Sequence, residues 1–307
     1  MAVQTTGSLT AEMKTWYDRV LLKAARERLI HNKWSQKRPI PRGEGKTVNW
    51  RRFELLTVPS ASLVEGVTPP GSDLSITSVE ATPTQEGDYV TLSDLLTWTA
   101  IDPVMTETVS ILGYQAGEKL DDMTRDVLVA GTTVRYAGAA TSRVTVAAAD
   151  KINGIELRKM RRTLRLNKAQ PAEGGFFPLI VSPNTFYDLQ SMDEWVSRAE
   201  NSRPGELDTG QVGEIYGFRV YESQKAKVFS GAGASSIDVH ASVAIGKDFY
   251  GTTSIEGHAM ETIMKPLGSA GTADPLNQRA TAGWKATHVA KILNESFGAR
   301  LEHAVTG

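Results

Sequence analysis

Residues 48–96 read VNWRRFELLTVPSASLVEGVTPPGSDLSITSVEATPTQEGDYVTLSDLL, and this stretch decides the fold. It has no helical periodicity, and its strand-like runs at 48–58 and 88–96 flank a region broken by prolines and glycines. Connections inside a compact domain have a median length of about 4–6 residues, so a loop of this length would be exceptional. The stretch therefore predicts a long two-stranded arm that has no core of its own and packs against another surface.

A helix is expected before the arm, over residues 10–33. Apolar side chains recur there at spacings of three and four, and Thr10 is a suitable N-cap residue. The sequence KRPIPRGEGK at 37–46 then forms a basic linker, rich in proline and glycine, that leads into the arm.

A longer helix is expected after the arm, starting at Asp102-Pro103 with a polar cap and a proline in its first turn. Apolar residues continue from Met105 to Val134 at spacings of three and four, which corresponds to about 45 Å of helix. Gly113 and Gly117 lie within this helix, where small residues permit a neighbouring backbone to approach closely.

The remainder of the chain predicts a mixed unit of helices and strands over residues 151–265, followed by a closing strand at 284–301. The expected elements are a basic helix at 152–168, a buried strand at 176–183, a short helix capped by Ser182, and strands at 218–221, 237–245 and 259–265. The whole chain is therefore expected to fold in the α+β class.

The charges are strongly segregated along the chain although the formal net charge is only −1. Residues 1–60 hold twelve Lys and Arg against five acids, whereas residues 61–130 hold two against twelve. Residues 143–168 are basic again, with eight Lys and Arg against two acids. Complementary blocks of this kind steer association between copies, and the alternative is that they form solvated faces of one globule.

The composition excludes several classes of protein. The chain has no cysteine, and hence no disulfide, thiolate nucleophile or Cys-ligated metal. Its longest apolar runs, such as FFPLIV at 176–181, are far shorter than the roughly 20 residues that cross a bilayer. The N-terminus does not resemble a signal peptide, so neither export nor membrane insertion is indicated.

No catalytic, cofactor-binding or metal-binding residues are indicated. GEGKT at 43–47 ends like a phosphate-binding loop, but Ile40 stands where that motif requires glycine. GAGASS at 231–236 is interpreted as a hairpin turn, and the five histidines include no pair at helical spacing. Glu118, Asp121 and Asp122 are adjacent carboxylates, which we expect on the solvated side of the long helix.

The basic helix is a candidate for weak contact with nucleic acid that does not depend on base sequence. Its basic residues are spread around several faces and match no known DNA-reading motif. The candidate residues are Arg158, Lys159, Arg161, Arg162 and Arg165.

The order of these elements and several short stretches of sequence resemble one known family. The matching stretches are VNWRRFELL (48–56), LVEGVTPPG (63–71), QEGDYVTLSD (85–94), FPLIVSPNTFYDL (177–189), EIYGFRVYES (214–223) and AGWKATHVAKI (282–292). They resemble the major capsid protein of tailed double-stranded-DNA bacteriophages, with the Hong Kong phage-type capsid fold. The resemblance covers nearly the whole chain.

The resemblance implies a division of the chain into five parts. These are an N-terminal arm (1–46), an extended β-hairpin called the E-loop (47–97), a peripheral P-domain with a spine helix (98–150), an axial A-domain (151–265) and a return to the P-domain (266–307).

The resemblance also implies a function, which is self-assembly into pentamers and hexamers of an icosahedral shell around a DNA genome. The expected partners are further copies of the chain, packaged DNA, and portal, scaffolding and decoration proteins. The expected location is the virion capsid, after assembly in the cytoplasm of a bacterial host. The chain starts close to its arm helix, so a separate scaffold and no large propeptide are expected.

Two groups of residues are expected at subunit interfaces. The E-loop tip contributes Leu63, Glu65, Gly66, Val67, Thr68, Pro69 and Pro70, and the N-terminal arm contributes Trp16, Tyr17, Arg26, Arg28 and Trp34. The tip has no lysine, so covalent cross-linking of subunits is not expected. The alternatives are an encapsulin-like nanocompartment shell that encloses an enzyme and, from a different class, a soluble oligomeric enzyme.

Overall fold

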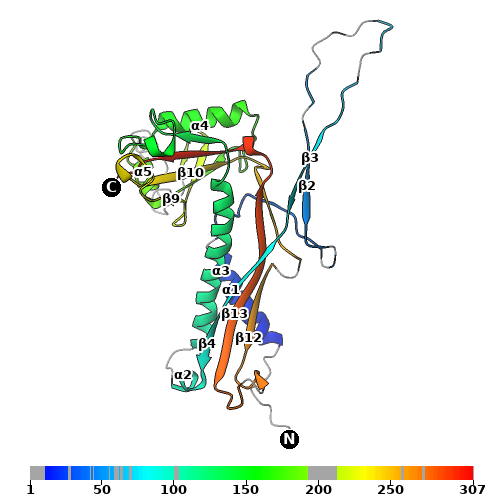
Figure 1. Ribbon diagram of the computed structural model, residues 1–307, viewed down its shortest axis with the longest axis vertical. Coiled ribbons are helices and arrows are strands. Elements are labelled where there is room, and N and C mark those ends of the chain that lie inside the picture. The colour runs from blue at the N-terminus through cyan, green and yellow to red at the C-terminus, as the bar shows by residue number, and fades with distance from the viewer. Residues whose placement is uncertain are drawn as a thin grey trace.

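The computed structural model describes residues 11–26, 29–41, 43, 45–54, 56–58, 62, 65–68, 71–99, 104–192, 213–256, 259–271 and 274–306. The molecule has three parts, which Figure 1 shows as an elongated helix-and-sheet unit, a second unit at one end of it, and a hairpin that projects from the same end. We call these parts the spine unit, the head unit and the hairpin. Together they contain helices and sheets whose strands pair mainly antiparallel, and the expected α+β class is confirmed.

The spine unit contains a sheet with the strand order β1-β11-β13-β12, in which β4 also pairs with β13. Its strands are β1 (Gln36–Lys37), β4 (Thr84–Ser93), β11 (Tyr250–Thr253), β12 (Met260–Lys265) and β13 (Arg279–Ile292). The helices α1 (Ala11–Arg26) and α3 (Val104–Val129) lie along this sheet, and the short α2 (Asp94–Thr99) lies at its far end (Figure 1).

One face of the spine sheet packs against the helices. Alternate residues of β13, among them Ala282 and Trp284, are buried against Leu112 of α3 and Leu21 of α1. The residues between them point to the opposite face of the sheet because successive side chains of a strand alternate. No described helix or strand covers that opposite face.

The head unit is built on a sheet with the order β5-β14-β10-β6-β8-β7, and β9 pairs with β10. Its strands are β5 (Val134–Tyr136), β6 (Phe177–Val181), β7 (Glu214–Ile215), β8 (Phe218–Glu222), β9 (Val228–Phe229), β10 (Val239–Ile245) and β14 (Gly298–His303). Its helices are α4 (Gly154–Leu166) and α5 (Pro183–Gln190), with 3-10 turns at Arg143–Thr145, Ala234–Ser236 and Glu295–Phe297.

The core of the head unit lies between this sheet and its helices. Leu157, Met160 and Leu164 of α4 are fully buried, as are Phe177 and Phe218 of the sheet. The basic helix expected at 152–168 is therefore present as α4, and these three residues form its inward face. Asn153 and Ser182 cap α4 and α5 as N-cap residues, because each side chain accepts a backbone hydrogen bond from the first turn.

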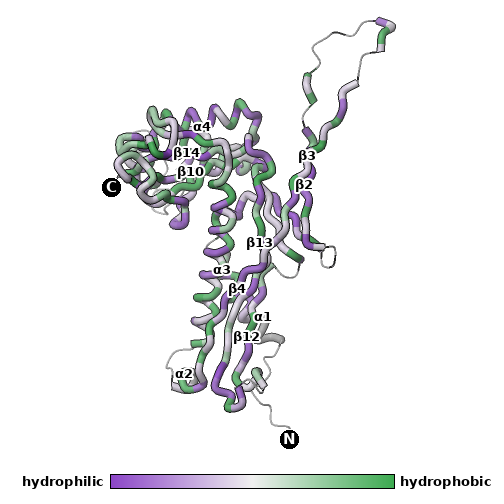
Figure 2. Tube along the Cα trace, viewed as in Figure 1, coloured by the Kyte–Doolittle hydropathy of each residue, from purple (hydrophilic) through white to green (hydrophobic). Residues whose placement is uncertain are grey.

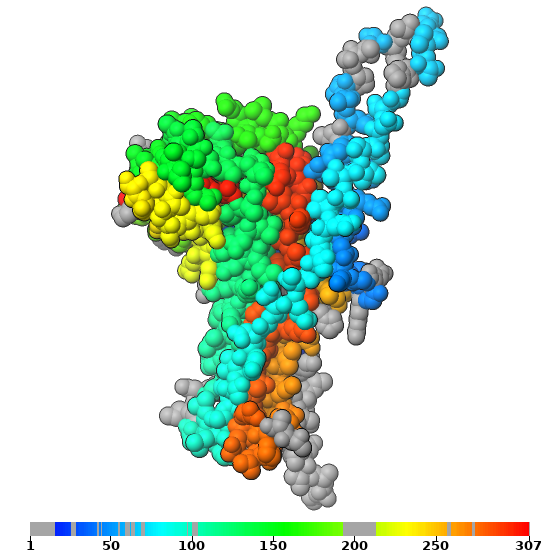
Figure 3. Space-filling view, in the orientation of Figure 1, coloured from blue at the N-terminus to red at the C-terminus, as the bar shows by residue number. Residues whose placement is uncertain are grey.

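The hairpin consists of β2 (Val48–Phe53) and β3 (Ile76–Ala81), which pair antiparallel. Figure 3 shows its outer end projecting beyond the body of the molecule, and Figure 2 shows hydrophobic residues along its length. The predicted two-stranded arm is therefore present.

The last strand of the arm region differs from expectation, because β4 leaves the hairpin. It pairs with β13 of the spine sheet from Thr84 to Ser93 and ends there instead of at residue 96, because α2 begins at Asp94.

The ends of two helices also differ from the sequence-based expectation. Helix α1 ends at Arg26 instead of residue 33, since residues 31–34 form a turn that is bonded to α3. Helix α3 ends at Val129 instead of 134, and β5 follows after Gly131.

The expected closing strand at 284–301 is two strands. β13 lies in the spine sheet and β14 lies in the head sheet, with a 3-10 turn between them. The proposed domain limits at 151–265 stay a prediction, but β5 and β14, outside these limits, share a sheet with β6, β8 and β10.

Candidate subunit-interface surfaces

The outer part of the hairpin carries apolar side chains that nothing in the described chain covers. Phe53 and Ile76 face each other across the two strands, and they are 60% and 51% exposed. Further along, Leu56, Val58, Val67 and Leu74 are also exposed. An isolated two-stranded ribbon is marginally stable in water, and an apolar surface of this kind marks an interaction site.

The expected E-loop tip lies at the end of the hairpin. Glu65, Gly66, Val67 and Thr68 are described there and are exposed. Gly66 has a φ of 77°, a left-handed conformation that favours glycine, so this residue fits a turn at the tip. Leu63, Pro69 and Pro70 lie outside the described residues.

The uncovered face of the spine sheet forms a groove of about 750 Å³. Tyr89 of β4 lies directly across from Gly283 of β13, and a Cβ atom on this glycine would be 2.8 Å from the Tyr89 Cβ. Tyr89 and Ile263 are partly or largely exposed and supply apolar surface. Basic residues also line the groove, namely Lys265, Arg279 and Lys285. Sequence reasoning missed this groove, because the groove depends on which strands pair with β13.

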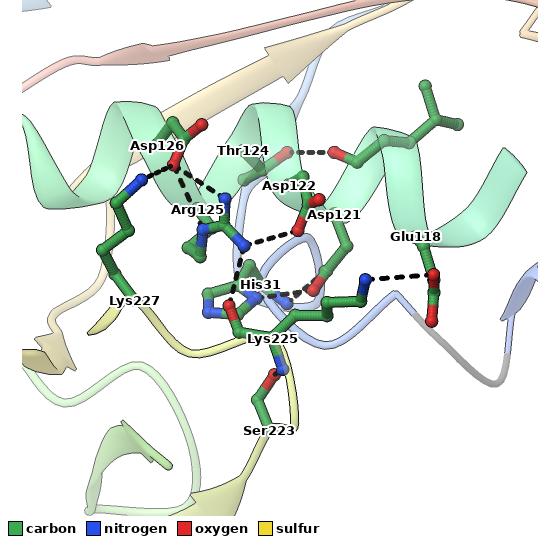
Figure 4. Close-up of polar contacts among 11 residues, drawn as sticks. His31, Glu118, Asp121, Asp122, Thr124, Arg125, Asp126, Ser223, Lys225 and Lys227 are labelled. Carbon is green, nitrogen blue, oxygen red and sulfur yellow. Dashed lines mark hydrogen bonds and ion pairs between the residues drawn. The ribbon is translucent and has the colours of Figure 1, made fainter. Parts of the chain in front are cut away.

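The N-terminal arm is fixed to α3 by a buried polar contact. The backbone N–H of His31 donates to Asp121 Oδ1 over 2.7 Å, and the His31 Nδ1 lies 2.6 Å from Asp121 Oδ2 (Figure 4). Both residues are 1% exposed, and the hydroxyl of Tyr250 donates to the His31 carbonyl oxygen. The expectation that Asp121 lies on a solvated helix face is wrong, because the arm covers that side of α3.

Other acidic residues of α3 bind the loop that follows β8. Lys225 Nζ lies 3.1 Å from Glu118, and Lys227 Nζ lies 3.3 Å from Asp126. Figure 4 also shows Arg125 between Asp122 and Asp126, while it donates to the Lys225 carbonyl oxygen. These contacts join the head unit to the spine unit.

The arm residues expected at an interface fall into two groups. Trp16 is 46% exposed at the surface of α1, with its ring edge-on to Tyr17. Trp34, in contrast, is engaged inside its own chain, because its Nε1 donates to Glu173 over 2.7 Å and its ring contacts Tyr221. Arg26 ends α1, and Arg28 lies outside the described residues.

Glu173 accepts several hydrogen bonds at the junction of the arm and the head unit. Tyr221 donates to it over 2.7 Å, and Arg219 donates over 2.9 Å. Burial opposes ionisation, yet the hydrogen bonds from Tyr221, Trp34 and Arg219 hold the pKa of Glu173 below its usual value. Burial and the Glu173 carboxylate raise the pKa of Tyr221 to about 12.

The candidate nucleic-acid residues lie on α4, at the outer side of the head unit (Figure 1). Arg158 and Arg165 lie over the rings of Tyr216 and Phe177, and Lys159 pairs with Glu156. Arg161 and Arg162 are exposed. The structure thus leaves much of this basic face accessible.

Neither a metal site nor a membrane span is found in the described part of the chain. It contains no group of three or more His, Asp or Glu side chains placed to hold a metal ion. Over the same ranges, no helix combines the length and hydropathy that crossing a bilayer requires.

The sequence matches a protein family over most of its length. The profile of a family described as phage capsid protein matches residues 77–301. The chain belongs to this phage capsid protein family. It is therefore a structural capsid protein, as the resemblance implied. No curated protein is significantly similar to it in sequence.

Solved capsid structures share the fold of this capsid protein. The capsid of Ralstonia phage GP4 has a TM-score of 0.72 at 14% identity, covering 100% of this chain and 94% of that chain. The cyanophage Pam1 capsid has a TM-score of 0.70 at 15% identity, with coverages of 100% and 97%. The capsid of cyanophage P-SCSP1u has a TM-score of 0.69 at 14% identity, with coverages of 91% and 89%.

Proposed function

We propose that this chain is the major capsid protein of a tailed double-stranded-DNA phage, and that its copies form the pentamers and hexamers of an icosahedral shell. The observation that carries the proposal is the hairpin with its uncovered apolar side chains. Phe53, Ile76 and their neighbours leave more than half of their surface in water within one chain, so they gain further stabilisation by contact with another copy.

The uncovered groove of the spine sheet is the surface that best fits the hairpin of a neighbouring copy. Its Tyr89 and Ile263 offer apolar area to the apolar hairpin side chains. Its basic residues, such as Lys265 and Lys285, complement the acidic tip, which carries Glu65 and, on the returning strand, Asp73. Acidic residues of the block at 61–130 would then be paired with basic residues of another copy.

Other predicted contacts are assigned to further surfaces. The exposed Trp16 and the partly buried Tyr17 of α1 are proposed to meet a neighbouring subunit, and the basic face of α4 is proposed to make sequence-independent contacts with packaged DNA. Portal, scaffolding and decoration proteins are proposed as partners, and the cytoplasm of a bacterial host as the place of assembly. The role is structural, and the proposal involves no catalytic residue.

The two alternatives gain no support. A nanocompartment shell needs a seat for cargo, and no observation on α1 favours cargo over a neighbouring subunit. An enzyme needs convergent ionisable groups in a pocket, whereas the groove of the spine sheet is a broad strand surface with dispersed charges.

The proposal is tested by charge reversal at the tip. We expect Glu65→Lys to abolish particle formation, as followed by light scattering and electron microscopy, while the melting temperature of the subunit stays within about 2 °C of the original. Glu222→Lys makes the same charge change on an exposed residue of the head unit and serves as the control. Equal losses of particle formation and of subunit stability in Glu65→Lys would contradict the proposal. Uniform particles formed by this variant would also contradict it.

A further inference from the structure

The hairpin leaves the body of the protein at a sharply defined point. On one face of the ribbon, Val48 and Trp50 are 5% and 4% exposed, whereas the side chains of Arg52 and Glu54, next along that face, are 35% and 40% exposed. The buried root packs with Ile40 and Ala81 in a small apolar cluster. The ribbon therefore leaves the body of the protein just beyond Trp50, and we call this point the pivot.

At this pivot the indole of Trp50 lies on a glycine. A Cβ atom built on Gly251 of β11 would stand 2.8 Å from Trp50 Cε2, 2.9 Å from Nε1 and 3.0 Å from Cζ2. Real Cβ atoms do not approach a rigid ring so closely, so only glycine permits this contact. Gly251 is itself held between β1 and β13, where it pairs with Gln36 and Lys291.

The indole is held by shape, because its Nε1 has no hydrogen-bond partner among the described residues. A buried donor without a partner costs about 1–3 kcal/mol. Packing against Gly251 therefore keeps Trp50 in place in spite of that cost.

An arginine ties the ribbon down on the far side of the pivot. Arg52 Nη1 donates to the Leu293 carbonyl oxygen over 3.0 Å, just beyond the end of β13. The same guanidinium binds Glu54, which also accepts from the Thr77 hydroxyl of β3 over 2.7 Å. Both strands of the ribbon are thus linked through Arg52 to the spine unit.

We propose that the seat of Trp50 on Gly251 is a positioning element that sets the angle at which the hairpin leaves the subunit. Neither residue touches the hairpin tip, but a small rotation at the root moves the tip by a much larger distance. The seat thereby fixes where the tip meets a neighbouring copy, so this inference rests on the proposed role of the hairpin in assembly.

The experiment measures the hairpin angle directly. Since the chain has no cysteine, Val58→Cys and Ile155→Cys place one spin label on the hairpin and one on α4, both at exposed positions. Electron-electron distances are recorded on labelled chain diluted into an excess of unlabelled chain, so that distances within one molecule dominate. The same labels are introduced with Gly251→Ala, Trp50→Phe or Gly233→Ala.

Gly251→Ala is expected to shift or broaden the distance distribution and to lower the particle yield at least tenfold. Trp50→Phe keeps an aromatic ring and removes the unpartnered donor, so it is expected to keep both the distance and the particles. Gly233→Ala is the matched control, because its Cβ would stand 2.7 Å from Ile237 in the head unit, far from the hairpin. It is expected to lower the melting temperature and leave the distance unchanged.

An unchanged distance distribution in Gly251→Ala overturns the proposal. If this variant does not fold, Trp50→Ala replaces it, since removal of the ring frees the hairpin without inserting an atom. A shifted distance with normal particles would support the positioning role and overturn the proposed role of the hairpin in assembly. The two failures are therefore distinguishable.

Discussion

Gly117 of α3 lies so close to Ala25 of α1 that a Cβ atom on the glycine would stand 2.6 Å from the Ala25 carbonyl oxygen. One turn earlier, Gly113 has the same relationship with Leu21, at 2.8 Å from its carbonyl oxygen. The two helices are thus in backbone contact, and α1 is held against α3 at the two positions where α3 has no side chain. The close approach predicted from the small residues in the sequence is confirmed.

Gly117→Ala is therefore expected to destabilise the subunit. In an unobstructed helix this change would stabilise by roughly 0.5–1 kcal/mol, but the clash with α1 costs about 1–3 kcal/mol and reverses the sign. Denaturant unfolding of the subunit measures the effect. Glu107→Ala, at an exposed position of the same helix, is the control and is expected to change the free energy of unfolding by less than about 0.5 kcal/mol. A stabilised Gly117→Ala variant would show that the helices do not pack as described.

The buried contact between His31 and Asp121 is expected to hold the arm. Asp121→Ala should lower the free energy of unfolding by about 3–5 kcal/mol, because it leaves a buried polar partner behind. His31→Ala should have a similar effect, and the double variant should lose less than the sum of the two, since they share one interaction.

Asp122→Ala is the matched control for this pair. Asp122 is the next residue of α3, but its side chain is 34% exposed and bonded to Arg125. Exposed ion pairs contribute about 0–1 kcal/mol, so a small loss is expected. Losses of equal size for Asp121→Ala and Asp122→Ala would contradict the anchoring role of Asp121.

The stability of the subunit is expected to fall as the pH drops below about 6.5. Burial lowers the pKa of His288 and of His303 to about 4, from the ordinary histidine value of 6.5. Below pH 6.5 these two histidines therefore bind protons in the unfolded chain, whereas in the folded chain they stay neutral until about pH 4. The free energy of unfolding decreases over that window. Each histidine contributes up to about 1.4 kcal/mol per pH unit.

Unfolding curves at pH 7, 6 and 5 check this prediction. Carboxylates whose pKa is lowered by folding, such as Glu173, also contribute less to the free energy of unfolding as the pH falls. Their contribution decreases only near and below the ordinary pKa of 4.5. The histidines consequently dominate between pH 6.5 and 5. His303→Gln keeps a polar group near Ser242 and should reduce the slope by about one proton. An equal free energy of unfolding at pH 7 and pH 5 would rule the effect out.

The sequence predicts the elements of this capsid protein better than their partners. Local signals suffice for α4, whose apolar stripe at Leu157, Met160 and Leu164 and whose cap at Asn153 are properties of one segment. The division of residues 284–301 between two sheets is not such a property, because it depends on the 3-10 turn at Glu295–Phe297 and on which strands lie beside each half.

The same limit applies to the candidate interfaces. The hairpin could be predicted because residues 48–96 lack helical periodicity. The stretch is also too long and too irregular to build a core of its own. Asp121 could not be recognised as buried, since its partner His31 is ninety positions away along the chain. The contact between Trp50 and Gly251 could not be predicted from the sequence either, because neither residue is unusual in its own strand.

The basic face of α4 is expected to bind duplex DNA through phosphates, without regard to base sequence. Replacement of Arg161 and Arg162 together by Gln removes two exposed charges and should weaken binding at low salt. It should also reduce the slope of log K against log salt by about 2, because each phosphate contact contributes about 0.9.

The measurement is fluorescence anisotropy of a short labelled duplex titrated with the capsid protein at several salt concentrations. Lys225→Gln with Lys227→Gln is the matched control, since it makes the same change in charge at residues that pair with Glu118 and Asp126 of α3. The control should leave the slope within about 0.5 of the original, because those ammonium groups are already occupied by carboxylates. Identical slopes for the two double variants would mean that α4 responds only to net charge and forms no DNA contact of its own.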